Sequence, residues 1–436
     1  MNIPADPAAS IGANRNESPA PFPGHLDFDG AMPRQVLECY LARSISMAGL
    51  LMGRGHFDDN LRMLKNIGAL FAGRAISHWG RERSLVENLA RGKTLAARIH
   101  AEHPRIMLQA AVFEVVTPDV ACIDIPPWVF EAFALAPERR PFHYENMLFP
   151  DGLYVNHWPR GGSVPDITRL ETRLWFYFLA VSYLNIGIES IHWGQIALIG
   201  RHDPELDNWW DLLGRVRAYA AHYARRRFVL NDAHVSSGVG CFGLSRDAAD
   251  APGGYRTGDR LLLDVHALPL RIKEIASQPR TAELAMGHLD SLYGRSLDGV
   301  TPSGWRCDSL PYLVEFDNYG NSGRPGDSVV GKIDPLVGIA SDYWIWGWDE
   351  ITWFANQSEE ERNRWLWYAW RWVREHDTSG YVQMPGMRRL SASANGLSEY
   401  FANTPSEACP EGQNQETTIK SIWDEHLKAP HGGGPA

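Results

Sequence analysis

Residues 45–77, ISMAGLLMGRGHFDDNLRMLKNIGALFAGRAIS, contain the pattern that decides the fold. The apolar run at 45–53 predicts a strand, and 57–68 has apolar positions at helical spacing that end at Gly68. A second apolar run, 69–77, follows at once and predicts another strand. A strand, a helix and a strand in this order form a βα unit, whose strands lie parallel.

The unit recurs along the chain and predicts an α/β protein. The strand candidates are 45–53, 69–77, 106–115, 188–195, 227–234, 260–267, 312–318 and 342–349. Most are separated by helical segments, and eight such strands predict an irregular (β/α)8 barrel rather than an open doubly wound sheet. No GxGxxG motif follows the first strand, which disfavours dinucleotide binding. Residues 117–165, rich in proline and aromatic residues, predict a long insertion after strand 3.

Length and composition favour one large domain. We expect a disordered leader at 1–25, a barrel domain at 26–400 and a C-terminal extension at 401–436. The hydrophobic share is 44% and the charged share 22%, typical of a soluble globular protein. A net charge of −10 argues against nucleic-acid binding through a basic surface.

The sequence also indicates a compartment. No apolar run reaches the roughly 18 residues of a membrane span, and the N-terminus does not look like a secretory signal. The 5 cysteines are odd in number and lack CxxC spacing, which favours free thiols in a reducing compartment. We therefore expect a cytoplasmic protein with no membrane partner, and the sequence leaves open whether it forms a homo-oligomer.

Polar side chains come late in nearly every predicted strand. In a (β/α)8 barrel the C-terminal strand ends form the active site, so these residues are site candidates. In chain order they include Arg74, Glu114, His192, Gln195, Asp232, His234, Asp264, His266, Glu315 and Asp317. A ring of this kind is difficult to explain as core packing.

The carboxylates among them suit glycoside hydrolysis, which needs one carboxylic acid and a second carboxylate as base or nucleophile. Glu315 and Asp317 are two apart, so in an extended strand both point to one face. We expect one of them, with Asp317 nearer the strand end, to act as base or nucleophile. Glu114 or Asp232 would then be the acid. This mechanism requires no cofactor or metal.

The remaining candidates suit binding of an oligosaccharide or glycoside. Histidine, glutamine and arginine side chains hydrogen-bond sugar hydroxyls, and tryptophan rings stack on sugar faces. We expect such roles for His192, Trp193, Gln195, His234, Asp264, His266, Arg74, Trp344, Trp346 and Trp348. The chain has 17 tryptophans, eight of them between residues 344 and 372, an excess in keeping with this interpretation.

Two alternatives remain open. The pairs Asp232/His234 and Asp264/His266 repeat a D-x-H pattern that could bind a divalent metal, together with His192, in a metal-dependent hydrolase or sugar isomerase. The tryptophan-rich sequence also fits a non-catalytic glycan-binding barrel.

The motifs AVFEVV, IESIHWGQ, LNDAH and LVEFDNYG, set into this repeat, resemble the TIM-barrel glycoside hydrolases at fold level. The resemblance covers roughly residues 45–375. The large retaining clan with this fold carries Asn-Glu at the end of strand 4 and Glu at strand 7. Here Gln195 stands at the expected position of the strand 4 acid/base, and Glu315 or Asp317 loosely matches the strand 7 position. The resemblance therefore implies a carbohydrate-active barrel in which a standard retaining mechanism is in doubt.

Overall fold

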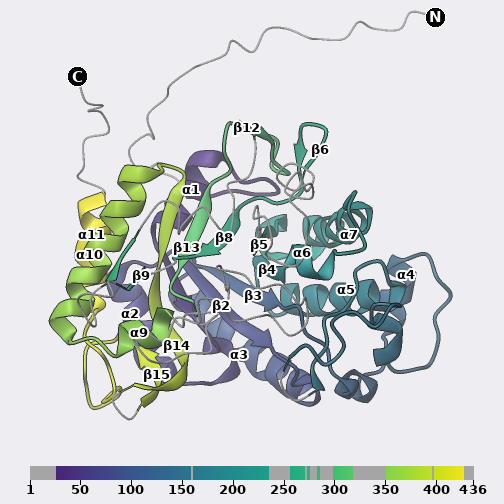
Figure 1. Cartoon of the computed structure of the whole chain (residues 1–436), viewed down its shortest axis with the longest axis horizontal. Coiled ribbons are helices and arrows are strands. Elements are labelled where there is room, and N and C mark those ends of the chain that lie inside the picture. The colour runs from purple at the N-terminus through teal and green to yellow at the C-terminus, as the bar shows by residue number, and fades with distance from the viewer. Residues whose placement is uncertain are drawn as a thin grey trace, which may run out of the picture.

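A closed barrel of eight parallel strands forms the centre of the molecule (Figure 1). The computed structural model describes residues 26–158, 161–234, 256–270, 273–274, 282–284, 298–317, 350–394 and 397–426. In barrel order the strands are β1 (Ser44–Met47), β2 (Phe71–His78), β3 (Met107–Val112), β4 (Ser190–Gln195), β5 (Leu230–His234), β8 (His266–Pro269), β13 (Tyr312–Glu315) and β14 (Gly380–Ala394). Parallel pairing of β14 with β1 closes the ring, which confirms the predicted (β/α)8 fold.

The described helices lie around the barrel, at its N-terminal end and in the segment that follows β3. They are α1 (Arg34–Ala42), α2 (Phe57–Ile67), α3 (Leu85–Glu102), α4 (Pro127–Ala132), α5 (Leu170–Leu184), α6 (Ile196–Ile199), α7 (Asp207–Tyr223), α9 (Glu350–Ala355), α10 (Glu359–His376) and α11 (Glu416–His426). Figure 1 shows α5 and α7 on one flank and α10 and α11 on the other. The N-terminus of α10 is capped by Ser358, whose Oγ accepts a hydrogen bond from the Glu361 N–H at 3.2 Å. No helix in the described ranges is long and apolar enough to cross a membrane.

Two strand predictions require correction. The range 342–349 lies outside the described residues, and the eighth barrel position, between β13 and β1, is filled by β14. In the range 260–267, Arg260–Leu261 is strand β7 of a separate sheet, and the sixth barrel strand begins at His266. That separate sheet has the order β12 (Arg306–Cys307), β11 (Gly299–Val300), β7 and β6 (Arg256–Thr257). A further short pair joins β9 (Lys273–Glu274) to β10 (Ala282–Glu283).

The predicted insertion after strand 3 is present. It contains the 3-10 helices η3 (Pro118–Cys122) and η4 (Tyr144–Met147) and the helix α4. An isolated bridge between Val116 and Ser163 returns the chain to its starting point before α5 begins. The insertion therefore lies beside the C-terminal ends of β3 and β4.

The C-terminal part is attached to the barrel. Strand β15 (Leu397–Phe401) forms an antiparallel pair with β14. Helix α11 packs against α2, and Arg62 Nη1 of α2 donates to Glu416 Oε1 at 2.8 Å. Whether residues 401–436 form a separate extension stays a prediction.

The interior of the barrel changes character along the strands. At the N-terminal end, α1 residues such as Tyr40 and Leu41 share an apolar cluster with inward residues of six strands: Phe71, Met107, Leu230, Ala267, Leu313 and Tyr381. Side chains two positions apart on a strand point to the same face. Two residues farther along four of these strands are Gln109, Asp232, Glu315 and Gln383, all buried. The apolar base therefore supports a layer of polar side chains.

Candidate functional site

Arg74 lies at the centre of the polar layer, and the backbone turns it inward. Its φ is +56°, in the left-handed region, and the pairing of β2 with β3 is irregular between Ala72 and Ile76. The Arg74 N–H donates to Gln109 Oε1 at 3.0 Å instead of following the regular ladder. A non-glycine residue in this conformation costs about 1–3 kcal/mol and is over-represented at functional sites.

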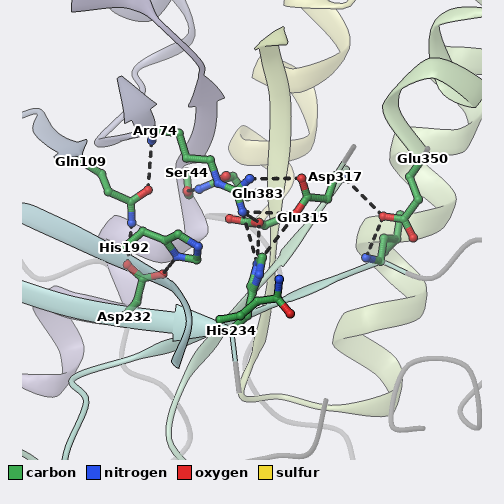
Figure 2. Close-up of polar contacts among 12 residues, drawn as sticks. Ser44, Arg74, Gln109, His192, Asp232, His234, Glu315, Asp317, Glu350 and Gln383 are labelled. Carbon is green, nitrogen blue, oxygen red and sulfur yellow. Dashed lines mark hydrogen bonds and ion pairs between the residues drawn. The ribbon is translucent and has the colours of Figure 1, made fainter. Parts of the chain in front are cut away.

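The guanidinium of Arg74 joins the two carboxylates of the seventh strand (Figure 2). Its Nη1 donates to Asp317 Oδ1 at 3.1 Å, and its Nη2 donates to Asp317 Oδ2 at 3.2 Å and to Glu315 Oε2. Arg388 Nη2, from β14, also donates to Asp317 Oδ1 at 2.7 Å. The shared contact with Arg74 shows that Glu315 and Asp317 point to one face of the strand, as the sequence predicts.

These pairs determine the charge of the cluster. Burial alone would raise the pKa of Glu315, but Arg74 and a hydrogen bond from His234 outweigh it and hold that pKa below its usual value. Burial also opposes the charge on Arg74, yet Asp317 and Glu315 raise the pKa of its guanidinium. At neutral pH Glu315 is therefore ionised beside a permanent cation.

A second group, from strands β3, β4 and β5, faces the first. His192 and Asp232 are register partners, and His192 Nδ1 lies 2.7 Å from Asp232 Oδ2. The other oxygen, Asp232 Oδ1, accepts from Gln109 Nε2 at 2.7 Å. Gln109 thus touches both groups, because its Oε1 accepts from the Arg74 backbone. Figure 2 shows the two groups side by side.

His234 lies between the two groups. Its Nε2 is 3.2 Å from both Arg74 Nη2 and Glu315 Oε2, and its ring centre is 4.7 Å from that of His192. Burial lowers the pKa of His234 to about 4, so its ring is neutral at pH 7. His266 is also buried, stacked on Tyr312 with the ring centres 5.0 Å apart, and burial lowers its pKa to about 3.

The metal alternative does not fit this arrangement. Atoms of His234, Glu315 and Asp317 lie within 4.8 Å of one another, close enough to serve as ligands. Arg74 Nη2, however, contacts all three of these side chains. A divalent ion would have to displace a guanidinium that the backbone directs into the same space. In the second D-x-H pair, Asp264 already has other partners: its Oδ2 accepts from the Asn231 N–H and from Arg217 Nη2.

Glu114 and Gln195 form a separate pair at the ends of β3 and β4. Glu114 Oε1 accepts from Gln195 Nε2 at 2.8 Å, and Glu114 Oε2 accepts from the Gln195 N–H at 3.0 Å. Gly194, the residue before Gln195, has a φ of +56°, and a Cβ there would clash with Glu114 Oε2. The glycine therefore allows the carboxylate to approach the backbone of β4.

Not every predicted residue joins the cluster. Trp193 faces away from the barrel interior: its Nε1 donates to Asn231 Oδ1 at 2.9 Å and its ring packs near Phe176 and Trp209. Asp264 lies just before β8, where its Oδ2 accepts from the Asn231 N–H and from Arg217 Nη2. Trp344, Trp346 and Trp348 lie outside the described residues. The roles of the four predicted catalytic carboxylates and of the predicted binding residues stay predictions.

Several residues of the site escape the strand-end rule. Gln109 and Gln383 lie within their strands, and Gln383 Nε2 donates to Ser44 Oγ at 2.9 Å. Arg388 belongs to β14, a strand that the sequence does not predict. Glu350, at the start of α9, accepts hydrogen bonds from the N–H groups of Leu270 and Asp317 and so fixes the ends of two strands. A search for polar residues on the inward face of each predicted strand would have found Gln109 but not Gln383, because β14 was not among the predicted strands.

Aromatic side chains connect the cluster to the surface. The ring of Phe113 lies 6.0 Å from His192 and 5.3 Å from Trp79, and Trp79 lies 5.0 Å from Trp158. Trp79 is 42% exposed. Trp158, from the insertion, is anchored by its Nε1, which donates to the Glu114 carbonyl at 2.7 Å.

The depressed histidine pKa values predict acid lability. An unfolded histidine titrates near pH 6.5, whereas folded His266 titrates near 3, so between these values the unfolded chain binds more protons. Stability should therefore fall with falling pH, by about 1.36 kcal/mol per pH unit for each such histidine. Urea unfolding of wild type and His266→Phe at pH 7, 6 and 5 measures this. The phenyl ring keeps the stacking on Tyr312, and we expect a shallower slope; equal slopes would contradict the prediction.

No protein-family model matches this sequence, and a search of the curated proteins finds no relative. Among solved structures, an alpha-amylase from Lactobacillus plantarum is similar over 52% of this chain and 53% of its own, with 13% identity and a TM-score of 0.32. The match thus spans about half of that amylase.

Two further structures are similar over more of their length. Isomaltulose synthase from Klebsiella sp. LX3 matches over 90% of this chain and 84% of its own, at 9% identity and a TM-score of 0.39. An inactive double mutant of MutB matches over 90% and 85%, at 10% identity and a TM-score of 0.36. The (β/α)8 fold itself rests on the strand pairing of this chain.

Proposed function

We propose that this protein is a carbohydrate-active hydrolase that cleaves glycosidic bonds at the polar layer of the barrel. The observation that carries the proposal is that Glu315 and Asp317 gather around Arg74, while Asp232, from the facing strand β5, bonds Gln109 in the same buried layer. Glycoside hydrolysis needs carboxylates on either side of the scissile bond.

The charge of the β13 carboxylates suits a base or nucleophile. Such a group must be ionised when substrate binds, and Arg74 keeps Glu315 ionised despite its burial. Asp317 is one layer nearer the C-terminal ends of the strands and is held by two arginines. We assign the base or nucleophile to Asp317 first, with Glu315 orienting Arg74 and His234 beneath it.

The acid would come from the facing strands. Asp232 lies in the same layer as Glu315, and Glu114 lies at the end of β3 beside Gln195. Trp79 and Phe113 offer flat faces between these groups and the surface, which suits the stacking of a sugar ring. The substrate class that follows is a neutral glycoside or oligosaccharide.

The test is hydrolysis of a panel of aryl glycosides and oligosaccharides by wild type and by four variants: Glu114→Gln, Asp232→Asn, Glu315→Gln and Asp317→Asn. We expect wild type to release sugar from at least one substrate, and at least one variant on each side of the layer to fall below one-tenth of that rate. If all four variants stayed above one-tenth, the assignment would be wrong. Ligand binding to wild type without cleavage would favour a sugar-binding barrel.

A further inference from the structure

The bonding around Asp232 leaves it poorly placed to give a proton to substrate. Both of its oxygens are engaged: Oδ1 accepts from Gln109 Nε2 and Oδ2 lies 2.7 Å from His192 Nδ1. The side chain is fully buried. An ionised carboxylate can only accept, so the proton between Asp232 and His192 resides on Nδ1.

This assignment fixes the tautomer of His192. With the proton on Nδ1, the neutral ring carries a lone pair on Nε2. In the described part of the chain, His192 Nε2 is buried and has no hydrogen-bond partner. A buried polar atom of this kind normally costs free energy, and its presence at a candidate site calls for an explanation.

The surroundings of the ring favour proton transfer. His234, the other titratable group of β5 beside the ring, is neutral at pH 7 because burial lowers its pKa to about 4. Phe113 covers another side of the His192 ring, with its centre 6.0 Å away. An aspartate on Nδ1 holds an imidazole in place and stabilises the positive charge formed when Nε2 takes up a proton. Gln109 completes the support.

We propose that His192 is the proton-transferring residue of this site, with Asp232 and Gln109 as its positioning residues. The proposal rests on the proposed glycoside hydrolysis and replaces its carboxylic acid by an imidazolium. The imidazolium forms when Nε2 takes up a proton from solvent. When the bond between the anomeric carbon and the leaving oxygen breaks, that oxygen takes this proton from Nε2. Water then adds its oxygen to the anomeric carbon, and the proton released by this water returns to Nε2.

The dependence of rate on the leaving group tests the role. A 2,4-dinitrophenyl leaving group departs without protonation, whereas an alkyl leaving group needs it. We expect His192→Gln to lose about 10²–10⁴-fold on an alkyl glycoside and less than about 10-fold on the dinitrophenyl glycoside. His100→Gln, at a half-buried histidine of α3 that bonds the Gly187 carbonyl, is the control and should change neither rate.

The positioning role of Asp232 has its own readout. Asp232→Asn should shift the alkaline limb of the pH–rate profile, because the amide no longer stabilises the imidazolium, while the dinitrophenyl glycoside is still cleaved. Equal losses by His192→Gln on both substrates would overturn the proposal, since that result describes a residue that only holds substrate. If wild type cleaves and Asp317→Asn does not, yet His192→Gln keeps the alkyl rate, the proposed function stands and this inference fails.

The tautomer of His192 can also be measured without substrate, which tests the inference when no substrate has been identified. In nuclear magnetic resonance spectra of protein with isotope-labelled histidine, His192 should appear as the Nδ1–H tautomer near neutral pH. Its Nδ1 proton should lie downfield and lose that shift in Asp232→Asn. An Nε2–H tautomer, or a spectrum unchanged by Asp232→Asn, would overturn the inference even if the substrate were still unidentified.

Discussion

Replacing Asp317 with asparagine is expected to abolish hydrolysis while leaving the protein folded. The amide has nearly the shape of the carboxylate and can still accept from Arg74 and Arg388, so the contacts at 3.1 and 2.7 Å survive in part. It cannot act as a nucleophile or accept a proton from water. Loss of such a group lowers the catalytic constant by about 10²–10⁴-fold.

The matched control lies at the opposite end of the barrel. Glu189 is buried just before β4 and pairs with Arg225 at 2.8 Å and with Arg226 at 2.9 Å. Glu189→Gln therefore removes the same kind of doubly paired, buried carboxylate far from the polar layer. We expect it to lower stability as much as Asp317→Asn while leaving the rate per folded molecule unchanged. Equal activity losses in the two variants, measured with the melting temperature of each, would refute a catalytic role for Asp317.

Replacing Arg74 with methionine is expected to have the largest effect on stability. The change leaves Glu315 and Asp317 buried together, with Arg388 still bonded to Asp317 and neutral His234 beside Glu315. Removing one partner of a buried ion pair costs about 3–5 kcal/mol. Urea unfolding at pH 7 should show a loss of this order. Arg74→Lys, which keeps the charge but cannot bridge two carboxylates, should lose less.

The pH dependence identifies the cause. Without Arg74, burial and mutual repulsion should raise the pKa of one carboxyl above its unfolded value, so the folded variant binds the extra proton. Its stability relative to wild type should then recover as the pH falls from 7 toward 5. The triple variant Arg74→Met, Glu315→Gln and Asp317→Asn should regain part of the loss at pH 7. A constant difference between Arg74→Met and wild type across this range would contradict the ion-pair account.

Much of the fold can be predicted from the sequence because the alternation of strands and helices is visible in short stretches of the chain. Seven of the eight barrel strands overlap their predicted ranges, since each apolar run is bounded by helix signals such as Gly68. Strand β14 has no comparable signal: it carries Pro385 and Gly386, residues that normally argue against a strand. The structure accommodates them at a register shift, where a Cβ on Gly386 would come within 2.5 Å of Met47 Sδ.

The sequence predicts most residues of the candidate site but not which of them bond to one another. The strand-end rule finds Arg74, His192, Asp232, His234, Glu315 and Asp317, because each lies late in a strand. It cannot find that Arg74 bonds the β13 carboxylates, because that contact depends on an irregular, left-handed residue in β2 and on the closure of the barrel. Arg388 was missed along with its strand. The separation of Trp193 from the cluster follows from its face on β4, which sequence position near the strand end does not reveal.

The most direct test of the central claim is chemical rescue. In Asp317→Ala and Glu315→Ala, the missing carboxylate leaves room for azide, a small anion that can attack the anomeric carbon in its place. Mass spectrometry of an activated aryl glycoside incubated with each variant, with and without azide, detects the product. We predict that one variant is inactive alone and forms a glycosyl azide when azide is present. Folded variants that both hydrolyse the glycoside at the wild-type rate would contradict the claim that the β13 carboxylates break the glycosidic bond.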